Sequence, residues 1–501
     1  MLDYILLKTL EFLEEMPKSK RKKKGQFFTS KETAEYMAGL FNTNNIPDNI
    51  RILDPGAGTG ILATALTERI QKKENIKKIS LVCYETDVEV LSVLKENLEY
   101  VKQHCLTDFE YQIKEEDYLL SQSEDFEKNE TSKEKQTKYD FIIGNPPYLK
   151  ILKNDPAALA MPTVVHGAPN LYFLFAAMSL FNLKNDSEMV YIIPRSWTSG
   201  AYFKAFRKYL LNNGKIEHIH LFASRDKVFS QEQVLQETII VKIKKTMKTP
   251  ENVTLTSSQS NGDFNNLSSI TLPYESIVAG DDLYVFLPTN ENELNTVTKI
   301  NQYSDTLPDL GFKMRTGIVV DFRQFDDLRK NETADTCPLF YSQHIKNGKV
   351  NHIPSSKNYE WLTTKKSSLV QKNKNYVFCK RFTAKEEKRR LQCGIYLKED
   401  FSQYSVIGTQ NKINFIDSTS GNEMSKQEVY GLYALFNSTL FDQYYRILNG
   451  STQVNSTEIN SIPVPPINTI RDIGQHLMDT KELSTETCDR ILEEVAYGQT
   501  E

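Results

Sequence analysis

The sequence has no pair of cysteines at CxxC spacing, although six cysteines are spread over its 501 residues. This absence excludes a zinc ribbon and a dithiol redox motif, and it predicts a reduced, cytoplasmic protein. No metal site is expected either, because His218 and His220 alternate along one expected strand without completing a set of ligands.

Long apolar runs are also missing. No stretch approaches the roughly 18 uncharged apolar residues that a transmembrane helix needs. The N-terminal run is interrupted by Lys8, Glu11, Glu14 and Glu15, so it does not have the apolar centre of a secretory signal. The sequence therefore predicts no membrane partner.

Excess positive charge is absent as well. The chain has 61 Lys and Arg against 65 Asp and Glu, a formal net charge of −4, which excludes a polycationic nucleic-acid coat. Any nucleic-acid binding has to come from local basic surfaces. With 39% hydrophobic and 25% charged residues, the composition is that of a globular protein, and the length predicts two or three domains.

Between Arg51 and about Lys245, short apolar runs such as IRILD, YDFIIG and ETIIVKIKK alternate with longer amphipathic stretches. This alternation predicts an α/β fold with a mostly parallel sheet. A helix is expected over residues 2–12 and an exposed loop over 121–138. Ser, Thr and Asn become frequent after Lys245, which predicts one domain over residues 1–248 and a mixed α+β domain with a C-terminal helical segment over 249–501.

A glycine-rich turn, DPGAGTG at 54–60, stands between the apolar run IRIL and the helical pattern ILATALTERI. Glycines let a backbone approach a ligand closely at such a turn. The next expected strand ends in Glu85, where a carboxylate can accept hydrogen bonds from ribose hydroxyls. Because the glycines at 56, 58 and 60 depart from GxGxxG, we expect an adenosine-containing cofactor other than a nicotinamide dinucleotide. A purely structural turn is the alternative.

Asn145, Pro146, Pro147 and Tyr148 follow the expected strand YDFIIG, at the end where α/β sheets place ligand chemistry. An exocyclic amine on an aromatic ring is a poor nucleophile because its lone pair is delocalised. The Asn145 carboxamide oxygen and the Pro146 carbonyl could accept its two hydrogens, while the prolines hold both acceptors still. Tyr148 offers a flat face for stacking on the ring. A rigid turn without a ligand is the alternative here.

In this order, DPGAGTG, Glu85 and NPPY resemble the AdoMet-dependent amino-methyltransferases. GQFFTS at 25–30 is similar to the N-terminal cofactor motif of their gamma class, the type II DNA adenine-N6 methyltransferases. The segment 435–466, which contains TQVN and ends in PVPP, resembles the closing segment of the PstI/BsuBI modification group. The resemblance covers nearly the whole chain.

The resemblance implies a Rossmann-like, AdoMet-dependent catalytic domain over 1–248 and a DNA target-recognition domain over 249–501. It assigns the methionine end of AdoMet to Gln26, Phe27 and Thr29, and the cofactor turn to Asp54, Gly56 and Gly58. Glu85 would hold the ribose. Asp117 would hydrogen-bond to the adenine of the cofactor, with Glu115 and Glu116 as open alternatives. Phe229 is placed opposite Tyr148 for stacking on the target base.

Methylation of an adenine amine within duplex DNA requires the nucleotide to be flipped out of the stack. Residues 365–390 hold ten Lys or Arg against Glu386 and Glu387, a local charge of +8. We expect phosphate contacts in this segment, with a solvated face as the alternative. The residues predicted to contact phosphate are Lys380, Arg381, Arg389 and Arg390.

The resemblance also implies a type II restriction-modification system with the target CTGCAG. A cognate restriction endonuclease would share the site without needing to bind, and the methyltransferase would act as a monomer. Two other hypotheses are a methyltransferase that acts on RNA or on a protein glutamine amide, and a binding protein of the same fold without catalysis.

Overall fold

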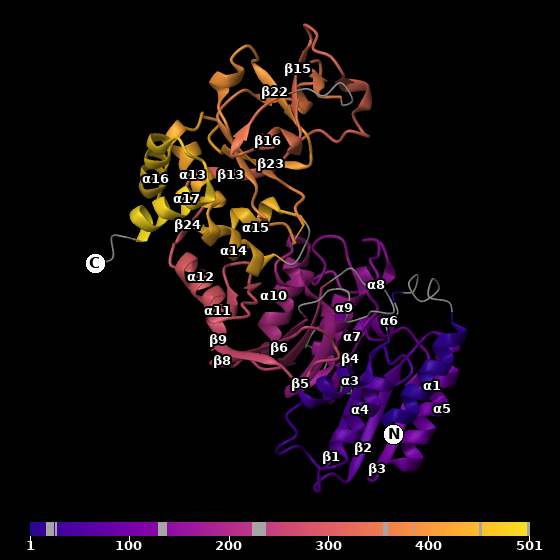
Figure 1. Ribbon diagram of the computed structural model, residues 1–501. Helices are drawn as coiled ribbons and strands as arrows, with labels where there is room; N and C mark the ends of the chain where they lie inside the picture. Colours follow the sequence, from indigo (N-terminus) through magenta and orange to yellow (C-terminus); the bar gives the residue numbers. More distant parts are fainter. Residues whose placement is uncertain are drawn as a thin grey trace. The chain divides into compact units, whose positions relative to one another are not determined.

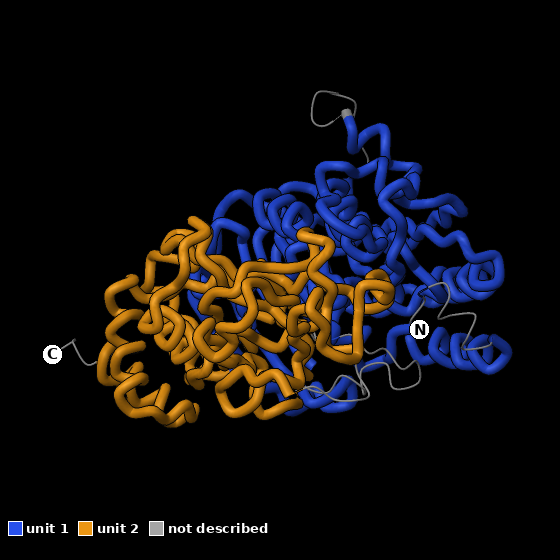
Figure 2. The backbone as a smooth tube through the Cα atoms, turned by 90° about the horizontal axis from the view of Figure 1, so that it is seen from above, with its two compact units in different colours: residues 1–289 blue, residues 290–501 orange. Residues whose placement is uncertain are grey.

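The computed structural model describes residues 1–16, 25, 28–128, 138–222, 237–353, 359–384, 386–449 and 453–497. The chain forms two compact units, Met1–Thr289 and Asn290–Glu501, which Figure 2 shows in two colours. Unit 1 contains both the glycine turn and the NPPY motif.

Unit 1 is built on a nine-stranded sheet in the order β3-β2-β1-β4-β5-β7-β6-β8-β9 (Figure 1). The strands from β1 to β5 pair in parallel, whereas β7 runs antiparallel to both of its neighbours. The mostly parallel α/β sheet predicted from the sequence is thus confirmed. The strands are β1 (Asn49–Asp54), β2 (Lys78–Tyr84), β3 (Asp108–Lys114), β4 (Tyr139–Gly144), β5 (Leu183–Pro194), β6 (Lys215–Phe222), β7 (Thr238–Lys244), β8 (Asn252–Ser258) and β9 (Ser268–Pro273), with the short pair β10 (Val278–Ala279) and β11 (Tyr284–Val285).

In unit 1, α1 and α3 precede β1, and the other helices lie in the connections between the strands. The expected N-terminal helix is present as α1, three residues longer than predicted, and it packs on α4 and α5. The helices are α1 (Leu2–Glu15), α3 (Lys31–Gly39), α4 (Ile61–Ile70), α5 (Val88–His104), α6 (Tyr118–Ser121), α7 (Ser123–Lys128), α8 (Pro156–Leu159), α9 (Leu171–Asn182), α10 (Lys204–Asn213) and α11 (Tyr274–Ile277).

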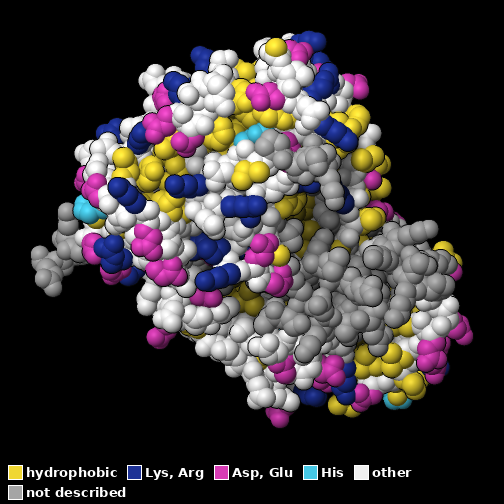
Figure 3. Space-filling model, turned by 45° about the horizontal axis from the view of Figure 1, so that its top comes forward, with side chains coloured by type: hydrophobic (Ala, Val, Ile, Leu, Met, Phe, Trp, Pro, Cys, Tyr) yellow, Lys and Arg dark blue, Asp and Glu magenta, His cyan; other side chains and the backbone are white. Residues whose placement is uncertain are grey.

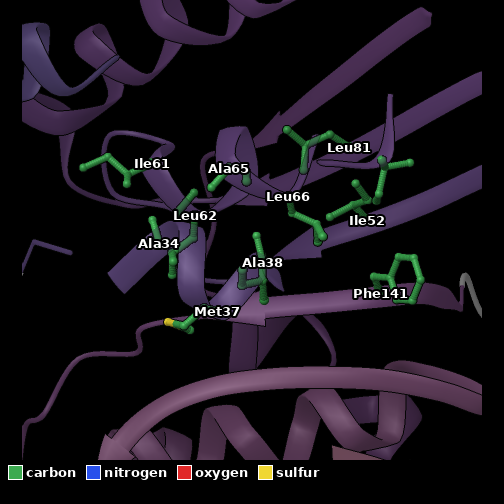
Figure 4. Packing of buried hydrophobic residues seen from close by; sticks show 14 of the residues in the cluster. Ala34, Met37, Ala38, Ile52, Ile61, Leu62, Ala65, Leu66, Leu81 and Phe141 are labelled. Carbon is green, nitrogen blue, oxygen red and sulfur yellow. The ribbon is translucent and has the colours of Figure 1, made fainter. Parts of the chain in front are cut away.

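One buried cluster joins α3 and α4 to the central strands (Figure 4). Ala34 and Met37 of α3 and Leu62 and Leu66 of α4 pack with Ile52 of β1, and each of these side chains is at most 5% exposed. The end of β1 that leads into the glycine turn is fully buried, and this burial holds the start of the turn in place. The core thus anchors the loop that carries the candidate cofactor residues.

Three details differ from the sequence prediction. Strand β3 was not predicted, because it is an edge strand on which most side chains stay accessible and so lacks an apolar run. The expected loop over 121–138 contains the short helix α7 in its described part. The division between units falls after Thr289 rather than after residue 248, because β8 and β9 extend the same sheet beyond that point.

Unit 2 combines short strands with helices. A six-stranded sheet has the order β13-β23-β20-β21-β17-β16, a five-stranded sheet has the order β14-β18-β15-β22-β19, and β12 pairs with β24. The mixed α+β architecture expected for the second domain is present. The strands are β12 (Asp305–Thr306), β13 (Phe312–Thr316), β14 (Leu328–Arg329), β15 (Thr336–Phe340), β16 (Ile345–Lys346), β17 (Lys349–Val350), β18 (Trp361–Thr363), β19 (Gln371–Lys372), β20 (Tyr376–Lys380), β21 (Cys393–Tyr396), β22 (Val406–Thr409), β23 (Ile413–Ser418) and β24 (Pro463–Val464).

The helices of unit 2 lie mainly at its C-terminal end, where α13 packs against α16 and α17. Gly431 of α13 permits this close approach, because a Cβ there would lie 2.0 Å from the Ile470 carbonyl oxygen. The helices are α12 (Glu291–Asn301), α13 (Lys426–Asn437), α14 (Thr439–Leu448), α15 (Ser456–Asn460), α16 (Ile467–Thr480) and α17 (Thr485–Leu492).

Within the described residues, no helix combines the length and the apolar character needed to cross a bilayer. All six cysteines are free thiols, and five of them are buried.

Candidate active site

A cavity of about 640 Å³ opens at the carboxyl ends of the parallel strands of unit 1. Glu85 directly follows β2, Asp117 lies shortly after β3, and Asn145 directly follows β4. Parallel strands bring their carboxyl ends to the same edge of a sheet, so these three side chains line one cavity. The glycine turn after β1 forms a further wall.

The glycine turn has a backbone that only glycine adopts readily. Gly58 has φ +55° and Gly60, the N-cap of α4, has φ +87°. A Cβ at Gly60 would lie 3.1 Å from Leu94 Cδ1, so α4 packs closely on α5 at this point. The turn therefore presents its backbone to the cavity.

Glu85 is fastened to this turn. Its Oε2 accepts from Gly58 N at 3.0 Å, and its Oε1 accepts from Thr86 N and Asp87 N, both at 2.8 Å. Burial raises the pKa of the Glu85 carboxyl, and these backbone N–H groups partly offset that effect. The carboxylate is thus held rigidly at the cavity wall, with further lone pairs that can accept hydroxyl donors.

Asp54, at the end of β1, is fully buried and is not part of the cavity wall. Neither carboxylate oxygen has a hydrogen-bond partner of normal geometry among the described residues. Burial raises the pKa of Asp54 to about 7. The cavity wall itself begins at Pro55.

The acidic run at 115–117 divides into two roles. Glu115 forms an ion pair with Lys95 at 2.5 Å and is not part of the cavity wall. Glu116 and Asp117 both line the cavity, and Asp117 Oδ1 also accepts from Leu120 N at 2.9 Å as the N-cap of α6. Of the three candidates for an adenine contact, two therefore remain.

The N-terminal segment meets the NPPY loop through two hydrogen bonds. Asn145 Nδ2 donates to Thr29 Oγ1 at 3.2 Å, and Tyr148 N donates to the Gly25 carbonyl at 3.1 Å. A Cβ on Gly25 would lie 3.2 Å from the Tyr148 backbone, which accounts for the small residue. Gln26 and Phe27 lie outside the described residues.

Tyr148 is tied to the neighbouring strand. Its hydroxyl donates to the Ile192 carbonyl of β5 at 3.0 Å, and its ring meets Tyr172 edge to face at 6.3 Å. Burial raises the pKa of the Tyr148 phenol well above its ordinary value, so the group stays neutral. Phe229, predicted to lie opposite Tyr148, is outside the described residues.

Phe28 and Val88 are two cavity residues that were not singled out from the sequence. Phe28 lies next to Gly58, and Phe175, the last residue of the aromatic run NLYFLF at 170–175, lies next to Gly56. Val88 lines the cavity although it is 78% exposed. Its position three residues beyond Glu85, at the first turn of α5, is the signal that could have identified it. Together these side chains give the cavity apolar walls.

In unit 2, the four residues predicted to contact phosphate differ in their exposure and in their hydrogen bonds. Lys380 and Arg381 are half-buried. Arg389 donates to the Phe436 and Ser438 carbonyls. Arg390 is only 1% exposed, so the prediction that it reaches a phosphate is wrong. Sequence could not reveal this, because the run of cations gives no sign of which one turns inward.

The +8 charge of segment 365–390 is also reduced by partners from elsewhere in unit 2. Lys365 pairs with Asp335, Lys366 with Asp327 and Lys374 with Asp417. On the face drawn in Figure 3, Lys and Arg side chains lie interspersed with acidic ones. Any contact with a polyanion therefore depends on a few cations rather than on the whole segment.

Arg390→Met is expected to lower stability without a specific effect on ligand binding. Arg390 Nε donates to Thr383 Oγ1 and its guanidinium lies 5.7 Å from the Tyr445 ring centroid. Removing the charge from this buried network should lower the free energy of unfolding by about 3 kcal/mol. Urea denaturation measures it, with the exposed Lys388→Met as the control. Equal unfolding free energies for the two variants would contradict the structural role.

Within the described part of the chain, no group of three or more His, Cys, Asp or Glu could hold a metal ion. His218 and His220 instead hydrogen-bond to Thr256 of β8, each at 2.9 Å.

Comparison with known proteins places this site in context. The family model of the Eco57I restriction-modification methylases matches residues 69–229. Type II methyltransferase M.BsuBI of Bacillus subtilis is 34% identical over 480 residues, covering 91% of each chain. Type II methyltransferase M.PstI of Providencia stuartii is 33% identical over 480 residues, covering 94% of this chain and 92% of that protein.

Among solved structures, the type IIG restriction endonuclease BpuSI resembles this chain with a TM-score of 0.44 and 14% identity, covering 94% of this chain and 66% of that one. This structural similarity is too low to carry an argument, so the fold is assigned from the order of the strands in the sheet of unit 1.

Proposed function

Because the chain belongs to the type II methyltransferases of restriction-modification systems, which makes it a site-specific DNA methyltransferase, we propose that it methylates adenine N6 in a short duplex site. The observation that supports this most strongly is the cavity at the strand ends, which joins the glycine turn and Glu85 to Asn145 of NPPY. We further propose CTGCAG as the target, a monomeric enzyme in the cytoplasm, and a cognate endonuclease that shares the site. Unit 1 carries the transfer and unit 2 the target recognition.

The cavity suits AdoMet as the methyl donor. The turn at Gly56 and Gly58 leaves space that side chains would fill, and the Glu85 carboxylate can accept from ribose hydroxyls. Asp117 or Glu116 would accept from the adenine amine, and Phe28 and Val88 would cover apolar surface. When bound, AdoMet supplies an electrophilic methyl group on its sulfonium.

Asn145 is proposed to orient the target amine. Its Nδ2 donates to Thr29 Oγ1, so the carboxamide oxygen is the atom of this group that accepts a hydrogen from the adenine amine. The Pro146 carbonyl accepts the second hydrogen. Both acceptors favour a pyramidal nitrogen whose lone pair points at the donor, and the fixed φ of the two prolines keeps them in place.

The target adenine reaches this site only if it leaves the duplex. Tyr148 would stack on the flipped base, and its hydrogen bond to the Ile192 carbonyl holds the ring while it does so. Phe229 is the proposed partner on the other face of the base.

Methylation-sensitive sequencing tests the proposal. DNA would be taken from a host that has no other methyltransferase and that expresses either this protein or its Asn145→Ala variant. We expect N6-methyladenine at one short motif in the first DNA and none in the second. If neither DNA carries the modified base, the adenine-N6 proposal is wrong, and transfer to RNA or to a protein amide becomes the next assay.

Lys380→Gln is expected to weaken duplex binding evenly across sequences. Lys380 lines a cleft of about 560 Å³ in unit 2 together with Lys346 and Lys388, and its Nζ donates to Gln392 Oε1 at 2.9 Å. Loss of one phosphate contact lowers the slope of log K against log salt by about one. Fluorescence anisotropy at several salt concentrations measures this slope. An unchanged slope would assign Lys380 to an ordinary solvated surface.

A further inference from the structure

Phe322 is the most exposed aromatic side chain of unit 2 among the described residues, with 80% of its surface accessible. It stands at the tip of a turn that is held firmly at its base. Gln324 Oε1 accepts from Val320 N at 2.7 Å, and the Val320 carbonyl accepts from Arg323 N at 2.9 Å. A single exposed apolar ring is ordinary on a protein surface, so what accompanies Phe322 decides whether this turn is a site of interaction.

Phe382 repeats this arrangement on another turn. Its side chain is 46% exposed, and its backbone forms an antiparallel bridge with Gln453. In both turns the adjacent arginine lies over the ring, Arg323 over Phe322 and Arg381 over Phe382, each with its guanidinium carbon 5.5 Å from the ring centroid. Each turn thus presents one aromatic ring and one cation together.

Backbone hydrogen bonds join these turns into one continuous edge. Val319 N donates to the Thr409 carbonyl at 2.9 Å, and Asn411 N donates back to the Val319 carbonyl at 2.8 Å. Arg381 N donates to the Lys412 carbonyl at 2.9 Å, which connects the second turn. We call residues 317–324, 381–383 and 409–412, together with Gln453, the aromatic ridge.

Side chains stiffen the aromatic ridge. Arg381 Nη1 donates to the Asn411 carbonyl at 3.0 Å and its Nη2 to Gln453 Oε1 at 3.4 Å. Gln453 belongs to the TQVN stretch noted in the sequence, and its backbone lies beside Phe382. A preorganised edge of this kind loses little conformational entropy on binding.

We propose that the aromatic ridge contacts the bases of the recognition site, with Phe322 and Phe382 stacking against base faces or entering between base steps. This inference rests on the proposed function. Rings give base-stacking surfaces, the Asn411 and Gln453 amides suit base edges, and Arg323 and Lys412 suit the flanking phosphates.

The charges on the aromatic ridge favour DNA over a protein partner. Arg323 and Lys412 are exposed, whereas the carboxylate of Asp321 is half-buried and accepts from Gln410 Nε2 at 3.3 Å and from the Tyr341 hydroxyl at 3.4 Å. The carboxylate of Asp321 is thus partly shielded from solvent, whereas the side chains of Arg323 and Lys412 are accessible to a polyanion such as DNA.

The test compares the full-length wild type with Phe322→Ala/Phe382→Ala. Both rings are exposed, so the variant should fold. Fluorescence anisotropy measures binding to a labelled, unmethylated duplex that contains the motif found by sequencing, or CTGCAG if no motif is found. A second duplex, in which one base pair of that motif is changed, is measured in the same way. We expect a loss of cognate affinity of about tenfold to a hundredfold and a smaller loss for the changed duplex. AdoMet affinity should stay at the wild-type value.

Two further variants sharpen the result. Leu106→Ala removes an 83% exposed apolar side chain next to the amino end of β3, at the opposite end of the strand from the cavity, and should leave duplex binding unchanged. Phe322→Trp keeps a flat ring and should restore most of the affinity lost in Phe322→Ala.

The inference is overturned if the double variant binds the cognate duplex and discriminates the changed duplex as the wild type does, or if the wild type binds neither duplex. These outcomes are separate from failure of the proposed function. A wild type that binds through the aromatic ridge but leaves adenine unmethylated would refute the transfer proposal alone.

Discussion

Asn145→Ala is expected to lower kcat for methyl transfer about 10³-fold, because the variant loses a preorganised acceptor for the amine hydrogens. AdoMet affinity should change little, since Asn145 is one of many residues that line the cavity, the glycine turn and Glu85 among them. Steady-state transfer of a labelled methyl group measures kcat, single-turnover transfer measures the methyl-transfer step itself, and calorimetry measures AdoMet binding.

Asn145→Asp is the matched comparison. A carboxylate keeps an oxygen acceptor, and the Thr29 hydroxyl can donate to it in place of receiving the amide hydrogen. We expect Asp at this position to retain more activity than Ala. Wild-type turnover by Asn145→Ala would mean that the NPPY carboxamide does not orient the amine.

Glu85→Ala is expected to raise the Kd for AdoMet about a hundredfold. The substitution removes the carboxylate proposed to hold the ribose, and it leaves the N–H groups of Gly58, Thr86 and Asp87 without the acceptor that fixes the turn. Calorimetric titration with AdoMet measures the change.

Glu110→Ala provides the control for Glu85. Glu110 is an acid on β3 that pairs with Lys78 at 2.6 Å, and it is not part of the cavity wall. Its loss should leave AdoMet affinity at the wild-type value. If Glu85→Ala binds AdoMet as tightly as Glu110→Ala does, Glu85 does not hold the ribose.

Most of the sheet in unit 1 could be predicted from the sequence, because its central strands are buried on both faces and appear as apolar runs such as YDFIIG. The edge strand β3 could not, since half-exposed strands need no such run. The same limit applies to β8 and β9, whose Ser and Thr content suggested the start of a second domain although they pair within the sheet of unit 1.

The candidate site was predictable for a similar reason. The glycine turn, Glu85 and NPPY each follow a strand end, and parallel pairing brings consecutive strand ends to one edge without further information. Local residue types therefore determined which functional side chains are present. The order of the parallel strands determined that these side chains lie at one edge of the sheet.

Tertiary structure alone decided the assignments that depend on orientation. A run of cations has the same sequence signature whether a side chain is buried like Arg390 or exposed like Lys388, because the fold determines which way each one points. Likewise, the segments that carry Phe322, Phe382 and Gln453 are far apart in the chain and are connected by backbone hydrogen bonds and by the Phe382–Gln453 bridge. The sequence by itself determined the central strands of unit 1 and the cofactor motifs, since those arise from local periodicity and steric freedom. Long-range pairing decided which polar groups are buried and which aromatic rings are exposed to solvent.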